Sequence, residues 1–290
     1  MLIQWYPGHM AKARRILQED LKLIDVVVEL ADARAPLATR NPDFDDLFAQ
    51  KKRVLVLVKG DLADPAHTRE WLDFYAQSGV SALALSASKG TYKRAAAVEL
   101  IEKAAAEKVE AYRRRGVVKT VRAMVVGIPN VGKSTFINRM AGASRAQTGD
   151  RPGVTKTKQW IKISQYLELM DTPGLLWPKL ENEKLARDLA YIGSIKDDIM
   201  DVEQLAGHLL VDLMRVSAGA VTARYTKAQP DMDGQALLES VCQSRGMVLS
   251  GGRYDTERAA RIVLDEFRAG RIAKITLNTV REAAQADEGA

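Results

Sequence analysis

Residues 124–134 read Met-Val-Val-Gly-Ile-Pro-Asn-Val-Gly-Lys-Ser, and no other stretch constrains the fold as strongly. Val125 and Val126 end a short apolar run that indicates a buried strand. Gly127–Ser134 then match the pattern G-x-x-x-x-G-K-S/T, and helical character begins at Thr135. Such a loop turns backbone N–H groups towards a polyphosphate beside the positive end of a helix. The sequence therefore predicts a nucleoside triphosphate site rather than a chance Gly-Lys-Ser turn.

Each residue of this loop has an expected role. The Lys133 ammonium should reach the β- and γ-phosphates, and the Ser134 hydroxyl should ligate Mg²⁺. Gly127 and Gly132 let the backbone approach the phosphates closely. The predicted nucleotide-binding residues of the loop are Asn130, Val131, Gly132, Lys133, Ser134 and Thr135.

Composition narrows the class of protein. A chain of 290 residues should form two domains, or one large and one small domain. No apolar run approaches the roughly 18 residues that span a bilayer, and the first residues do not resemble a signal peptide, so we expect a cytoplasmic protein without a membrane partner. The single cysteine, Cys242, excludes an internal disulfide and a Cys-rich metal site.

The net charge of +6 leaves two interpretations open. It favours a polyanionic partner besides the nucleotide, but a basic protein without such a partner has the same charge.

Strands and helices are predicted to alternate before the P-loop. Asp25–Leu30, Arg53–Val58 and Ala82–Leu85 indicate strands, and helices are expected between and after them. This alternation predicts an α/β fold of the P-loop NTPase type, with a mostly parallel sheet covered on both faces. The expected helices are Ala11–Leu23, Pro65–Gln77 and Tyr92–Arg115.

The second half of the chain changes character. Trp160–Ser164 and Tyr166–Met170 indicate a β-hairpin, and strand signals fade beyond Pro178. We therefore expect a nucleotide-binding domain over residues 1–178, which includes the N-terminal segment 1–23, and a smaller all-helical domain over residues 179–290.

Two further motifs should complete the phosphate and metal site. In the D-x-x-G motif, the Asp171 carboxylate should lie near Mg²⁺ and the Gly174 N–H should sense a γ-phosphate. Thr155 stands where a switch threonine would close over Mg²⁺. The predicted metal ligands are therefore Ser134, Thr155 and Asp171.

Two short motifs predict recognition of guanine. Lys59 and Asp61 fit the end of the N-K-x-D base box, whose carboxylate accepts hydrogen bonds from guanine. Ser86 and Ala87 fit the motif whose backbone N–H binds the guanine O6. All these motifs follow predicted strands, where ligands bind in open α/β sheets.

The order of these motifs is unusual. The base motifs precede the P-loop, whereas the P-loop comes first in ordinary small GTPases, so the set is circularly permuted. At this point the chain resembles the circularly permuted GTPases, and within them the ribosome biogenesis GTPase A family, over most of its length. The segments that resemble the family are Trp5–Lys12, Asp32–Pro36, Gly127–Ser134, Arg151–Thr155, Asp171–Gly174 and Glu257–Arg261.

The resemblance implies a function and further residue roles. It implies a GTPase that converts GTP to GDP and phosphate with Mg²⁺ and K⁺, acting as a monomer on the large ribosomal subunit precursor and its ribosomal RNA. Leu175 replaces the glutamine of Ras-like enzymes. His9, by residue type a surface or capping histidine, becomes a candidate for catalysis beside Lys133 and Gly174, and Asn130 becomes a K⁺ ligand.

One departure keeps other functions open. Val58 stands where the base box has asparagine, and one lost hydrogen bond there costs roughly 1 kcal/mol. Asp61 still favours guanine over adenine, whose N1 is an acceptor. The alternatives are a nucleotide-gated RNA-binding module with incidental hydrolysis and an ATP-dependent P-loop enzyme.

The C-terminal part contains a predicted helix from Asp255 or Thr256 to about Gly270. Arg258, Arg261 and Arg268 share one face of it. That face is either solvated or in contact with RNA, and the resemblance favours ribosomal RNA.

Overall fold

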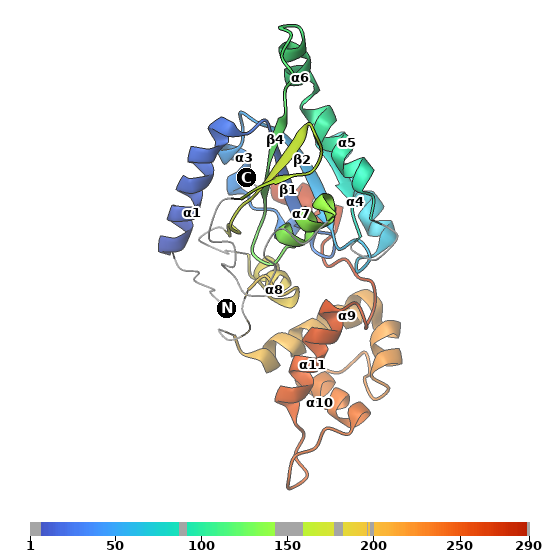
Figure 1. The fold of residues 1–290 in the computed structure, drawn as a ribbon. Coiled ribbons are helices and arrows are strands. Elements are labelled where there is room, and N and C mark those ends of the chain that lie inside the picture. The colour runs from blue at the N-terminus through green and yellow to red at the C-terminus, as the bar shows by residue number, and fades with distance from the viewer. Residues whose placement is uncertain are drawn as a thin grey trace.

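The structure is a computed structural model that describes residues 7–86, 92–142, 159–176, 182–195, 197 and 200–288, without the side chains of residues 7–13 and 286–288. Figure 1 shows an α/β body and a group of helices below it.

The α/β body is built on one six-stranded sheet with the strand order β3-β2-β1-β4-β6-β5. All neighbouring strands run parallel except β5, which pairs antiparallel with β6. This arrangement confirms the predicted fold class and the predicted hairpin. The strands are β1 (Val26–Asp32), β2 (Lys52–Val58), β3 (Ser81–Ala84), β4 (Val121–Val126), β5 (Gln159–Lys162) and β6 (Leu167–Asp171).

The central strands are apolar because helices cover both faces of the sheet. Every residue of β1 is buried, as expected for a parallel strand between two helical layers. The helices of the body are α1 (Pro7–Asp20), α2 (Pro36–Thr39), α3 (Asp43–Leu47), α4 (Pro65–Gln77), α5 (Arg94–Ala104), α6 (Ala106–Arg113), α7 (Lys133–Ala141) and α8 (Glu183–Tyr191).

Two predicted helices differ from the structure. The first helix begins earlier, with Pro7 at its start, and ends at Asp20 before a 3₁₀ turn over Leu21–Leu23. The single helix expected over residues 92–115 is two helices that meet at Ala105. The reason is burial: α5 packs on the sheet, whereas α6 has no buried residue and projects from the body (Figure 1).

The lower group consists of α9 (Val202–Arg224), α10 (Gly234–Arg245) and α11 (Thr256–Arg268). Asp255 caps α11 by accepting a hydrogen bond from the Arg258 N–H, as predicted. By length and composition α9 could cross a membrane. Its side chains Leu205, Leu209 and Leu213 are nevertheless buried in the core that α9 shares with α10 and α11, which is typical of a core helix.

The chain returns to the α/β body after α11. The Leu277 N–H donates to the Arg34 carbonyl at 2.7 Å, and the Trp71 indole donates to the Asn278 carbonyl at 3.1 Å. The last helix, α12 (Val280–Glu288), packs on α4. The group α9–α11 is thus connected to the body at both of its ends.

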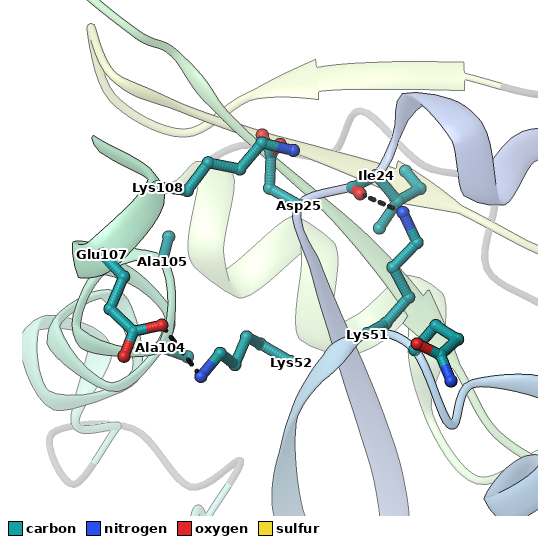
Figure 2. Close-up of a pocket in the computed structure, with 9 residues that line it drawn as sticks. Ile24, Asp25, Lys51, Lys52, Ala104, Ala105, Glu107 and Lys108 are labelled. Carbon is teal, nitrogen blue, oxygen red and sulfur yellow. Dashed lines mark hydrogen bonds and ion pairs between the residues drawn. The ribbon is translucent and has the colours of Figure 1, made fainter. Parts of the chain in front are cut away.

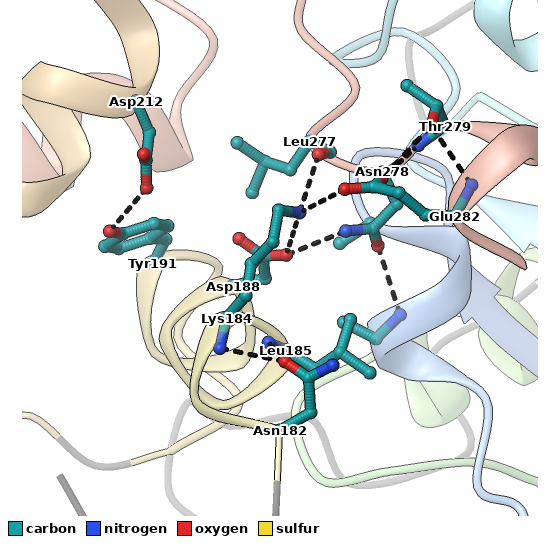
Figure 3. A network of polar contacts seen from close by, with 12 residues as sticks. Asn182, Lys184, Leu185, Asp188, Tyr191, Asp212, Leu277, Asn278, Thr279 and Glu282 are labelled. Carbon is teal, nitrogen blue, oxygen red and sulfur yellow. Dashed lines mark hydrogen bonds and ion pairs between the residues drawn. The ribbon is translucent and has the colours of Figure 1, made fainter. Parts of the chain in front are cut away.

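A buried polar network fastens this returning segment to α8 (Figure 3). The Asp188 carboxylate accepts hydrogen bonds from Lys184 Nζ at 3.2 Å and from Asn278 Nδ2 at 2.7 Å. Lys184 also donates to the Leu277 carbonyl. Burial raises the pKa of Asp188 to about 6, although both donors act to lower it.

This raised pKa predicts a pH dependence of stability. Between pH 4 and 6 the folded protein binds more protons than the unfolded chain, so its free energy of unfolding should fall as pH rises, by up to about 3 kcal/mol. Asp188→Asn should flatten that slope, because the amide oxygen can accept both hydrogen bonds without a charge. Urea unfolding at pH 4, 5, 6 and 7 measures how the free energy of unfolding depends on pH, with the substitution of the exposed Asp265, Asp265→Asn, as the matched control. An unchanged slope in Asp188→Asn would contradict the prediction.

Candidate nucleotide site

The P-loop lies between β4 and α7, as predicted. Gly127 has φ 153°, and a Cβ atom there would lie 2.8 Å from the Leu30 carbonyl oxygen of β1. Asn130 and Gly132 also have positive φ, 57° and 115°. These conformations exclude most side chains and explain two of the glycines of the motif.

Lys133 and Ser134 occupy the first turn of α7. The buried Lys133 ammonium donates to the carbonyls of Gly127 at 3.1 Å and Ile128 at 2.8 Å. Burial lowers its pKa to about 8, and Asp171 acts in the opposite direction. Its charge therefore faces the loop interior, where a bound polyphosphate would give it a stronger partner.

The predicted Mg²⁺ ligands of α7 and β6 are adjacent. Ser134 Oγ donates to Asp171 Oδ2 at 3.0 Å, and Asp171 is buried. A hydroxyl and a carboxylate fit Mg²⁺, which prefers oxygen ligands and keeps sites completed by water and phosphate. Among the residues that the structure describes, no group of three or more His, Cys, Asp or Glu side chains could hold a metal.

Gly174 of the D-x-x-G motif packs directly on the P-loop. A Cβ atom there would lie 2.7 Å from Pro129 N and 3.0 Å from Lys133 Nζ. The next residue, Leu175, donates its N–H to the Gly127 carbonyl at 3.2 Å. The predicted phosphate sensor therefore lies beside the lysine that is predicted to bind phosphate.

The base motifs come together at the ends of β2 and β3. The Gly60 N–H donates to the Leu85 carbonyl at 3.0 Å, which places the Lys59–Asp61 turn beside Ser86. Lys59 Nζ donates to the Asn130 carbonyl at 3.3 Å. The base box thus meets the P-loop, as a single nucleotide site requires.

Asp32, at the end of β1, belongs to a segment that resembles the family, Asp32–Pro36, but the sequence analysis gave it no role in this site. It is fully buried and lies opposite Val58 on the neighbouring strand. Its carboxylate binds Lys59 Nζ at 2.9 Å and the Arg34 guanidinium at 2.8 and 3.0 Å. Burial acts to raise the pKa of Asp32, but these two cations outweigh it and hold the pKa well below its usual range. Its position in the sequence, at the end of a strand neighbouring the base-box strand, was the available signal.

Asn130 connects the P-loop to the C-terminal helices. Its Nδ2 donates to the Gly193 carbonyl just after α8 at 2.9 Å. Gly193 in turn lies against the Arg268 side chain of α11. Arg268 donates to the carbonyls of Ala190 and Tyr191 and pairs with Asp197 at 2.7 Å.

The prediction that Arg268 shares an RNA-binding face with Arg258 and Arg261 is therefore wrong for Arg268. A helical wheel shows which side of α11 carries Arg268, but it does not show that α8 packs against that residue. Arg258 and Arg261 remain exposed.

Of the five remaining predicted residues, two are placed by the structure and three cannot be compared with this geometry in full. Val131 is buried within the loop, and Thr135 lies in α7. His9 lies in α1, and its side chain is outside the described part. Ala87 and Thr155 fall outside the described residues altogether.

Fold and site together define a P-loop GTPase whose base motifs precede the P-loop. Residues 122–219 match the family model described as 50S ribosome-binding GTPase, a stretch that contains the P-loop and Asp171–Gly174 but not Lys59–Asp61. Over 290 residues the chain is 44% identical to ribosome biogenesis GTPase A of Priestia megaterium, covering 98% of this chain and 99% of the relative. The chain belongs to the ribosome biogenesis GTPase A family.

Two solved structures share the fold. The GNP-bound YlqF from T. maritima is 25% identical, with a TM-score of 0.63, covering 92% of this chain and 98% of that one. The GDP-bound form has the same identity, a TM-score of 0.65, and coverage of 92% and 100%.

The Asp32 contacts predict a loss of nucleotide affinity in Asp32→Asn. The substitution removes the negative charge that pairs with the buried Arg34 and the half-buried Lys59, and breaking a buried pair costs about 3–5 kcal/mol. We expect a lower melting temperature and GDP affinity reduced by at least about tenfold, because Lys59 loses its anchor. Thermal unfolding and fluorescent-GDP titration measure both, with the exposed Asp73→Asn of α4 as control. Wild-type GDP affinity in folded Asp32→Asn would contradict the role of Asp32.

The lowered pKa of Lys133 predicts proton uptake when GDP binds. Near pH 8 about half of the lysines are neutral, and a bound diphosphate should raise the pKa and draw a proton. Calorimetry in buffers of different ionisation enthalpy should show more uptake at pH 8 than at pH 6.5, where Lys133 is already charged. Equal uptake at the two pH values would rule out titration of this lysine.

Proposed function

We propose that the chain is a GTP-driven switch that associates with the precursor of the large ribosomal subunit and leaves after hydrolysis. The observation that carries this proposal is the contact of Gly174 with both Pro129 and Lys133, because it joins the phosphate sensor to the phosphate-binding loop. A γ-phosphate between them would have to move Gly174. Such a displacement is the usual origin of nucleotide-dependent switching.

Each part of the site has a definite task in hydrolysis. Lys133 and the P-loop N–H groups hold the phosphates, and Ser134 and Asp171 would hold Mg²⁺. The ion would neutralise charge on the transferred phosphoryl group. Thr155 is proposed as its third ligand, and His9 as the residue that acts on the attacking water in place of a glutamine.

Selectivity for guanine would depend on Asp61 and on the turn at Ser86. The Asp61 carboxylate accepts hydrogen bonds from guanine but repels the N1 acceptor of adenine. Ser86 lies beside the Lys59–Asp61 turn, so the Ala87 N–H is proposed to bind O6. Val58 forms no polar contact with a base, whereas Lys59 is held by Asp32. We also propose that Asn130 contributes its side-chain oxygen to a K⁺ ion, since its nitrogen is directed to Gly193.

The switch is proposed to reach RNA through the C-terminal helices. Residues 1–178 would form the nucleotide-binding domain and residues 179–290 the helical domain, with residues 275–288 returning to the first. Asn130 and Gly193 provide a direct route from the P-loop to α8 and α11. The protein would act as a monomer in the cytoplasm, with ribosomal RNA as the ligand of Arg258 and Arg261. A nucleotide-gated RNA-binding module with incidental hydrolysis is the second candidate, because the same contacts would serve it.

Turnover of the full chain with GTP and with ATP, with and without large-subunit precursors, tests the proposal. We expect GTP to be preferred and subunits to raise kcat. Lys133→Ala should lower turnover at least about tenfold, since it removes a charge on the phosphates. The exposed Lys103→Ala of α5 is the matched control.

Three outcomes would change the assignment. Equal use of ATP would favour an ATP-dependent enzyme, and subunit binding without stimulated turnover would favour the RNA-binding module. Equal rates in K⁺ and Na⁺ at constant ionic strength would remove the K⁺ role of Asn130.

A further inference from the structure

The end of the sheet opposite the P-loop carries a concentrated positive charge. We call this surface the α6 edge: α6, the turn after it, the start of β4, the β5–β6 hairpin beside them, and the adjacent residues Asp25, Lys51 and Lys52. Figure 1 shows α6 projecting from the body on the side away from α9–α11. Since β4 runs from Val121 to Val126 and the P-loop follows, the two surfaces lie at opposite ends of this strand.

The turn after α6 is the most basic segment of this surface. Between Arg113 and Arg122 the chain has five cations and no acidic residue. Arg113, Arg114 and Arg115 are exposed, and Glu110 is the acid that pairs with the first two, at 3.8 and 3.4 Å. Exposed pairs of this kind contribute little and exchange readily, so these arginines are available to another anion.

Asp25 joins this turn to a neighbouring cavity. Its carboxylate binds Lys108 Nζ at 2.6 Å and Lys119 Nζ at 2.8 Å. Lys108 also lines a cavity of about 210 Å³, together with Lys51 and Lys52 (Figure 2). Burial lowers the pKa of the Lys51 ammonium, and the nearby positive charge of Lys108 lowers it further. An anion bound in this cavity would therefore stabilise the charged forms of both lysines.

In total the α6 edge holds nine cations against four carboxylates, an excess of five positive charges where the whole chain has +6. The cations are Lys51, Lys52, Lys108, Arg113, Arg114, Arg115, Lys119, Arg122 and Lys162, and the carboxylates are Asp25, Glu107, Glu110 and Glu168.

Two exposed aromatic side chains lie among these cations. Trp160 of the edge strand β5 is 37% exposed, and the Arg122 guanidinium lies 5.2 Å from its ring centre. Tyr166, 47% exposed, follows in the hairpin, and its carbonyl accepts the Val121 N–H that starts β4. Aromatic rings and arginine planes are the groups on which unpaired bases stack.

We infer that the α6 edge is an RNA-docking surface that binds a single-stranded segment or loop: the cations hold phosphates, and Trp160 and Tyr166 stack on bases. An acidic protein would also be attracted by the charge, but single-stranded RNA carries phosphates for the cations and bases for the rings in every nucleotide. The biological setting of this inference rests on the proposed function.

The position of the surface has two consequences. RNA phosphates held at the turn after α6 would not compete with a nucleotide, because β4 separates that turn from the P-loop. Trp160 pairs with Met170 and lies nearer to the P-loop than the turn does. The α6 edge would also be a contact independent of α9–α11, so the protein would hold RNA from both of its ends.

The test is titration of the full chain with a fluorescein-labelled single-stranded RNA dodecamer at several salt concentrations. Arg113→Ala/Arg114→Ala/Arg115→Ala should weaken binding at least tenfold and reduce the slope of log K against log salt by about 2, because each phosphate contact contributes about 0.7. Trp160→Ala should weaken binding about tenfold without changing that slope.

The matched control is Arg15→Ala/Arg69→Ala/Arg215→Ala, which removes three exposed arginines elsewhere. It should bind RNA as the wild type does. Wild-type affinity and slope in the triple variant of residues 113–115 would overturn the inference. So would equal weakening in the control, or competition by polyglutamate as effective as by RNA. Subunit-stimulated GTP turnover, measured in parallel, reports separately on the proposed function.

Discussion

The ion pairs of Asp32 are the interaction on which the site and its surroundings depend. A carboxylate without exposure to water is stable only when its charge is matched, and here Lys59 and Arg34 match it. Lys59 then reaches the P-loop at the Asn130 carbonyl, and Arg34 reaches the Arg268 carbonyl at the end of α11. One buried charge therefore sets the position of the base box relative to the phosphates and of the last helices relative to both.

The C-terminal helices contact the nucleotide site through backbone carbonyls as well as through apolar packing. Gly193 accepts from Asn130, and Ala190 and Tyr191 accept from Arg268. These carbonyls lie at the end of α8 and just after it, where backbone acceptors have no α-helical donor four residues on. The arrangement uses the unsatisfied end of one helix to join the P-loop to α11. When the P-loop changes its contacts, Asn130 can exchange its hydrogen bond to the Gly193 carbonyl for another acceptor.

Much of this architecture could be predicted from the sequence, because the P-loop, the D-x-x-G motif and the strand pattern are local signals. The meeting of Lys59 with Asn130 follows from placing those motifs at one edge of a parallel sheet, whereas the strand order was not predicted. Other features depend on distant packing. The break at Ala105 reflects where the sheet ends, and Arg268 faces α8 because of tertiary contacts that no helical periodicity contains. The role of Asp32 was hidden because its partners come from another strand and from the residue two positions on.

The return of the chain to the body after α11 has a mechanical consequence. The chain enters the group α9–α11 from α8, and it leaves through residues 275–278, which bond to Leu62 and Arg34. The group is therefore an insertion with two chain connections rather than an appendage with one. Rotation about the line between these connections preserves both of them, and it requires the bonds of Arg268 to Arg34 and to α8 to exchange. A change at the P-loop would then reach the far side of these helices as a rotation with one axis, and its amplitude would grow with distance from that axis.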